Sequence, residues 1–160
     1  MIDVMEWIKL IVFSGTASLG FGMLFRIEKK YLPLACLGGA FTRFVYLVME
    51  VLAPECFIYN FFAAMAAAAY AEYVAARTNN PTSVFLYPTI IPLIPVVQLY
   101  YSILGLIQQD VEMVGTYGVD CIHSLAGVGL GFIIISLCVV YMARYRGRKR
   151  RQAVKKAAAK

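Results

Sequence analysis

The sequence predicts an all-α polytopic membrane protein with about five transmembrane helices, the fourth broken by Pro88, Pro92 and Pro95. Of the 160 residues, 61% are hydrophobic and only 15% are charged. The mean hydropathy of +0.72 lies far above that of soluble domains. Several apolar runs are long enough to cross a bilayer, and the length leaves no room for a separate soluble domain. We therefore expect one transmembrane domain at 1–143 and a basic tail at 144–160.

The first two spans are expected at 7–25 and 31–52. The residues before Trp7 are acidic where a signal peptide would be basic, so the first span is expected to be retained, with Trp7 as an interfacial anchor. A short charged loop at 26–30 separates the two spans. An acidic, proline-bearing turn at 53–56 ends the second.

Small residues mark the third and last spans. The third, at 57–76, carries seven alanines between positions 63 and 71, which let another helix approach closely, so a central place is expected. A polar turn follows it. The last span, at 122–141, places Ser124, Gly127 and Gly131 on one face at helical spacing. The polar, glycine-bearing segment 108–120 before it is expected to be a loop.

The fourth span, expected at 84–106, contains the three prolines within eight positions. Each proline lacks an N–H and clashes with the carbonyl four residues back, so several helical bonds are lost. In hydrocarbon such freed backbone groups are tolerated only where they are buried in protein or line a wet cavity. A membrane helix broken near its middle points to a transporter binding site. Whether the segment spans the membrane or is re-entrant stays open.

The charge distribution predicts the orientation. Nine of the 15 basic residues lie between Arg144 and Lys160, directly after an apolar span, which favours a cytoplasmic anchor over a nucleic-acid site. With five spans the basic loops at 26–30 and 77 share the side of the tail, and the acidic loops lie on the other. We therefore expect the N-terminus outside and the C-terminus in the cytoplasm.

Arg43 is the first candidate for solute contact. It lies near the middle of the second span, where an arginine is costly and is kept mostly when it faces a cavity or a partner charge. The fourth span reaches its break at a similar depth. A guanidinium beside the positive N-terminal end of the second half-helix suits a carboxylate. The alternative is a structural ion pair, or hydrogen bonds to carbonyls exposed by the break.

Other polar residues surround the same region. Asn60 and Gln98, with Tyr100, Tyr101 and Ser102, could hydrogen-bond a solute in a cavity beside Pro92 and Pro95. Singly, each is more often a contact between helices.

Two carboxylates are candidates for proton coupling. Glu72 lies one turn from the inner end of the third span, and a raised pKa would let it carry a proton. Glu50 shares the face of Arg43, seven residues further on. For both, the commoner outcome is a carboxylate that reaches the membrane interface, where Glu72 could pair with Arg77.

Chemistry of other kinds has little support. The four cysteines show no paired spacing and His123 has no accompanying ligand pattern, so no metal site or other cofactor is expected. No nucleophile elbow, phosphate-binding glycine loop or HExxH motif is present. We do not expect an enzyme.

Further residues accompany the prolines along the chain. They are Ala71-Glu72, Ala76-Arg77, Pro81, Val84-Phe85, Ile90-Ile91, Leu93-Ile94 and Tyr100, with Ala17-Ser18, Phe21, Phe25, Gly38-Gly39 and Tyr46 in the first two spans. Together they resemble the threonine/serine exporter family, specifically its short, purely transmembrane subunit. The resemblance covers about 14–131. Val96 departs from it, because a glycine is expected after the third proline.

The resemblance implies a function. It implies a bacterial inner-membrane subunit that pairs with a larger protein of the same family to export threonine and serine, or a dicarboxylate such as succinate, driven by the proton motive force. The alternative is a scaffold subunit that stabilises a larger partner without contacting solute.

Overall fold

The computed structural model describes residues 4–158, with side chains up to Met142 and that of Tyr145. This part of the chain is helical and contains no strand. Its elements are, in order, α1 (Val4–Leu24), η1 (Lys29–Tyr31), α2 (Leu32–Leu52), α3 (Cys56–Thr78), α4 (Thr82–Ile90), η2 (Ile91–Leu93), α5 (Val96–Gln108) and α6 (Val111–Ala158). The predicted all-α fold is confirmed.

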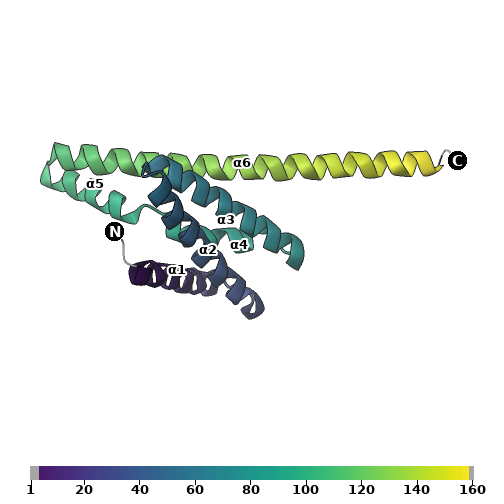
Figure 1. Cartoon of the computed structure of the whole chain (residues 1–160), viewed down its shortest axis with the longest axis horizontal. Helices are drawn as coiled ribbons and strands as arrows, with labels where there is room; N and C mark the ends of the chain where they lie inside the picture. Colours follow the sequence, from purple (N-terminus) through teal and green to yellow (C-terminus); the bar gives the residue numbers. More distant parts are fainter. Residues whose placement is uncertain (1–3, 159–160) are drawn as a thin grey trace.

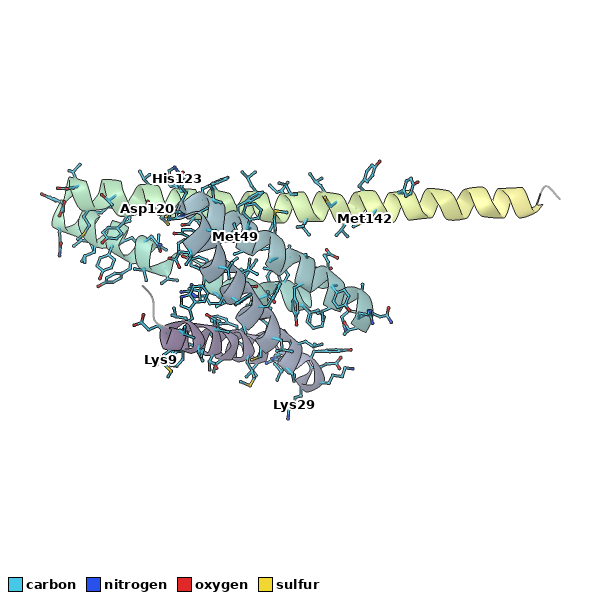
Figure 2. All side chains as sticks on the ribbon, in the orientation of Figure 1. Lys9, Lys29, Met49, Asp120, His123 and Met142 are labelled. Atoms are coloured by element: carbon cyan, nitrogen blue, oxygen red, sulfur yellow. The ribbon has the colours of Figure 1, made fainter. Side chains whose placement is uncertain are left out.

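The helices form a bundle from which one long helix extends (Figure 1). α1 and α2 make an antiparallel hairpin that turns at Arg26, a residue in the left-handed region with a φ of 56°. α3 packs against α2, α4 and α6, and α5 runs back along the first part of α6. Figure 2 shows Lys9 and Lys29 towards opposite ends of the α1–α2 hairpin.

Most of these helices can cross a membrane by length and composition. Three segments qualify singly, namely Val4–Leu24, Lys29–Leu52 and Val111–Met142, and Thr82–Leu93 with Val96–Gln108 qualifies as a bent pair. The predicted count of five spans also requires α3, a 23-residue helix outside that set. Its alanines, tyrosines and Asn60 make it less apolar. Because neighbouring helices bury α3, less of it needs to face lipid.

The segment 108–120 is not a loop, and this prediction was wrong. The chain turns only at Gln109 and Asp110, after which α6 begins at Val111. The Asp110 carboxylate accepts hydrogen bonds from the N–H groups of Glu112 (3.1 Å) and Met113 (3.0 Å), which caps the new helix. The Tyr101 and Tyr117 rings stack 5.0 Å apart and join α5 to α6. An Asp cap followed by Glu112 was the signal in the sequence.

The last span continues into the basic tail without a break. α6 has 48 residues and runs to Ala158, so the backbone shows no boundary at 144. The basic side chains expected to anchor the tail, from Arg144 onward, lie outside the described side chains.

α3 and α6 cross at the small residues that the sequence marked in each span, although it did not predict that these two spans would pair. Ala63, Ala64 and Ala67 of α3 are fully buried. A Cβ on Gly127 would lie 2.5 Å from the Phe57 carbonyl oxygen, and one on Gly131 would lie 2.6 Å from that of Phe61. The two backbones are therefore too close for any larger residue at either position.

Substituting these glycines should destabilise the bundle. Gly131→Ala forces α3 and α6 apart, and we expect it to lower stability by about 1–3 kcal/mol, or the melting temperature by roughly 3–10 °C. Gly129→Ala is the matched control on the same helix, because a Cβ there meets nothing within 4 Å. Thermal unfolding of the purified protein in detergent, followed by circular dichroism, measures both. Equal melting temperatures for the two variants would contradict this account of the crossing.

Candidate functional site

The broken fourth span forms as predicted. α4 ends at Ile90, one turn of 3-10 helix follows, and α5 starts at Val96, with the two halves bent by 55°. Pro88 lies inside α4, and Pro92 and Pro95 lie between the halves. The Val96 N–H donates to the Ile94 carbonyl oxygen at 2.8 Å. Val96 is absent from the residues of positive φ, so this backbone does not require the glycine expected there.

The α1–α2 hairpin covers one side of this break. Gly38 brings α2 close to α4, since a Cβ at Gly38 would lie 2.5 Å from Thr89 Oγ1. Thr89 itself is fully buried and donates its hydroxyl to the Phe85 carbonyl oxygen at 2.6 Å. η2 lies against α1 and α2. The hairpin therefore shields one side of the break, while Ile94 and Val96 on the break remain 47% and 61% exposed.

A cavity of about 210 Å³ lies beside the break. α2 contributes Arg43, α3 contributes Asn60, and the segment from Pro92 to Gln98 forms a third wall. The structure thus brings together five of the six residues expected to contact solute. They are Arg43, Asn60, Pro92, Pro95 and Gln98.

Arg43 is the charged residue of this cavity. Its guanidinium lies over the Tyr46 ring, 4.6 Å from the centroid, a cation–π contact. Arg43 Nε is buried and has no hydrogen-bond partner among the described residues. Among the described residues, no carboxylate lines the cavity. The first turn of α5, whose N-cap Pro95 supplies no side-chain hydrogen bond, adds the positive end of a helix dipole. This wall of the cavity suits an anion.

Ser124 and Tyr46 also line the cavity, and neither was predicted to contact solute. Ser124 is 1% exposed, and its Oγ has no partner among the described residues. It lies on the small-residue face of α6 together with Gly127, and the close crossing with α3 brings it to Asn60. The small-residue face was the signal in the sequence that Ser124 lies at a helix contact. Periodicity alone does not tell which helix packs against that face.

Tyr100 lies away from the cavity, unlike Gln98. It is 60% exposed, and its ring packs 5.3 Å from that of Tyr101. Two positions along a helix turn a side chain by about 200°, so Gln98 and Tyr100 cannot share one face. Tyr101 stacks on Tyr117, and Ser102 lies beside Gly118, so both face α6 instead.

Neither Glu72 nor Glu50 lines the cavity. Glu50 lies one turn after Tyr46, which does line it, whereas Glu72 lies towards the other end of the bundle. Glu72 is half-buried near the far end of α3, three turns or about 18 Å from Asn60. It forms no ion pair with a described residue, since Arg77 lies over the Tyr73 ring at 5.1 Å. Glu50 is half-buried in the last turn of α2 and likewise has no ion-pair partner among the described residues.

A second cavity has a volume of about 560 Å³. It lies where the turn between α2 and α3 meets α6, and it is lined by Glu55, Cys56, Asp120 and His123. Figure 2 shows Asp120 and His123 on α6. Cys56 lies one turn before Asn60, and His123 directly precedes Ser124. The lining of this second cavity is mainly negative, because Glu55 and Asp120 are acidic, whereas the Arg43 cavity is positive.

Replacing Arg43 should separate a structural role from a solute-binding one. A partly buried charge without a carboxylate partner destabilises a fold, so Arg43→Met should leave the melting temperature unchanged or raise it. Arg77→Met, at the exposed end of α3, is the control. Differential scanning calorimetry of the purified protein measures both. A fall of about 5 °C or more for Arg43→Met alone would show that the guanidinium holds the helices together.

Comparison with known proteins agrees with this architecture. Residues 10–138 match the model of a family described as threonine/serine exporter, ThrE. The match includes every residue that lines the Arg43 cavity. No curated protein and no solved structure was found to match. Proteins of this family are membrane transporters rather than enzymes. The chain therefore belongs to the threonine/serine exporter family.

Proposed function

We propose that this chain is a subunit of a secondary exporter of small carboxylated metabolites, and that its cavity binds the solute carboxylate. Threonine and serine are the solutes of the family description, and a dicarboxylate such as succinate is the second class. One observation carries the proposal. The Arg43 guanidinium faces a cavity at a broken membrane helix and has no acidic partner among the described residues.

The geometry supports a specific mode of binding. A carboxylate in the cavity accepts hydrogen bonds from Arg43 and from the uncapped N–H groups in the first turn of α5. The Tyr46 ring holds the guanidinium in place. With about 30 Å³ for each water molecule of the liquid, 210 Å³ accommodates roughly seven waters, or a solute of similar size. Threonine, serine and succinate all meet this limit.

A larger membrane protein of the same family is the proposed partner. α5 packs mainly against α6, and its other face carries exposed apolar residues beside the cavity. They include Val97, Ile103 and Ile107, which are 62%, 49% and 74% exposed. In a transporter of two subunits, the partner would cover part of this face and form the remaining wall of the solute path.

Export is proposed to be coupled to proton entry across a bacterial inner membrane. Glu72 and Glu50 are the proposed proton carriers, because both are half-buried and neither has an ion-pair partner among the described residues. They lie towards opposite ends of the bundle, where each can exchange a proton with one side. The proposed orientation places the N-terminus outside and the C-terminus in the cytoplasm, from the distribution of basic residues.

Export from cells tests the carboxylate site. Cells that lack their own exporters are preloaded with threonine, serine or succinate and express this chain with its genomic neighbour. Arg43→Ala should lower export by about 30-fold or more, as expected for losing a charge-assisted contact of about 2 kcal/mol. Arg77→Ala, which removes an exposed guanidinium, should export normally.

A pull-down of the partner from the same membranes shows whether Arg43→Ala acts on solute binding or on assembly of the two subunits. If Arg43→Ala exports like the native chain, the carboxylate site is wrong. If it dissociates the two subunits, Arg43 is structural and the scaffold alternative gains support.

Glu72→Gln tests proton coupling. The amide keeps the shape of the side chain but cannot carry a proton, so export should become insensitive to an imposed pH gradient. Glu28→Gln is the control, because Glu28 is exposed and paired with Lys30 at 2.7 Å. Export is measured at several external pH values. An unchanged response to the gradient would exclude Glu72 as the carrier and leave Glu50 for the same test.

A further inference from the structure

We propose that Ser124 and Asn60 recognise a second polar group of the solute and make the cavity select a hydroxyl- or ammonium-bearing monocarboxylate over a dicarboxylate. This inference rests on the proposed export function, since it assigns the part of the solute that Arg43 does not bind. It concerns the walls that α3 and α6 contribute, whereas Arg43 belongs to α2.

The Ser124 hydroxyl is buried, where a polar group normally has a hydrogen-bond partner, but it has none among the described residues. Four buried side-chain polar atoms have no hydrogen-bond partner among the described residues, on Ser18, Thr42, Arg43 and Ser124. Of these residues, Arg43 and Ser124 line the cavity. Leaving a buried hydroxyl unpaired costs free energy, so a group that enters the cavity and pairs with Ser124 gains correspondingly in affinity. Ser124 therefore points to a ligand in the same way as Arg43 Nε.

Asn60 supplies a fixed acceptor beside it. The Asn60 side chain is 3% exposed, and its amide nitrogen donates to the Cys56 carbonyl oxygen at 2.8 Å. That bond fixes the orientation of the amide, because a carbonyl can only accept. The amide oxygen of Asn60 has no other partner among the described residues and remains available to accept. A hydroxyl or an ammonium group can donate to it, whereas a carboxylate cannot.

The charges around the cavity favour the same class of solute. Among the described residues, Arg43 is the one charged residue that lines the cavity, so a dicarboxylate would leave its second carboxylate without a cation. The second cavity carries Glu55 and Asp120, and Asp120 lies one turn before Ser124 on α6. These carboxylates repel a second negative charge and attract an ammonium group. A solute with one carboxylate and a donor at its other end fits both walls.

Paired substrates test the role of Ser124. Inverted membrane vesicles that contain this chain and its partner take up radiolabelled L-threonine against unlabelled L-valine or succinate. Valine has the shape of threonine with a methyl group in place of the hydroxyl. The native complex should prefer threonine over succinate by at least tenfold. It should prefer threonine over valine by about tenfold, because valine keeps the ammonium group but lacks the hydroxyl that pairs with Ser124. Ser124→Ala should weaken threonine about tenfold while leaving valine unchanged, because only threonine loses a hydrogen bond.

Two further variants keep the test decisive. Ser124→Thr retains a hydroxyl and should restore most of the preference, which excludes a general loss of folding. Ser136→Ala changes an exposed serine of the same helix and should behave like the native chain.

The possible failures are distinguishable. A threonine-to-valine ratio that Ser124→Ala leaves unchanged, at normal abundance and uptake, overturns the role of Ser124. Succinate competing as well as threonine overturns the proposed selectivity while the export function stands. Native vesicles that take up neither solute overturn the proposed function itself, and this inference with it.

Discussion

The need to shield backbone polar groups from hydrocarbon shapes this protein more than any single contact does. Pro88, Pro92 and Pro95 interrupt the hydrogen bonding of one membrane helix, and the unpaired groups can persist only inside protein or in a wet cavity. The structure uses both solutions. The α1–α2 hairpin covers one side of the break, where Gly38 admits Thr89, and the Arg43 cavity borders another. The packing of the α1–α2 hairpin and the Arg43 cavity therefore both follow from the break in this helix.

Small residues then determine which polar groups reach that cavity. Gly127 and Gly131 let α6 lie directly on the backbone of α3. This contact places Ser124 beside Asn60, although the two are far apart in the sequence. Larger residues at the crossing would move Ser124 out of the lining without changing Ser124 itself. Glycines of α6 that contact no solute thus help to define what the cavity can bind.

Local features made much of this architecture predictable. A proline run or an arginine in the middle of a span can be interpreted without knowing how the helices pack. The break and the position of Arg43 beside it could therefore be predicted from the sequence. The prediction of a loop at 108–120 was wrong because it gave more weight to the glycines of this segment than to Asp110. Asp110 caps the helix through only two hydrogen bonds. The sequence did not indicate that Ser124 lines the cavity, and it grouped Tyr100 with the lining residues although the ring lies elsewhere, for another reason. Which face of α5 or α6 meets the cavity depends on helix packing, and single-sequence periodicity does not specify a partner.

The continuity of α6 also has a mechanical consequence. The helix that carries Ser124 runs unbroken to Ala158, without a proline or a loop between them. About 29 residues separate Gly129 from Ala158, a lever arm of roughly 43 Å at 1.5 Å per residue. If such a rod pivots rigidly by about 5° at its crossing with α3, its far end moves by roughly 4 Å. A rearrangement of the helices around the Arg43 cavity would thus be amplified at the basic end of the chain, and a force applied there would be transmitted back to the cavity.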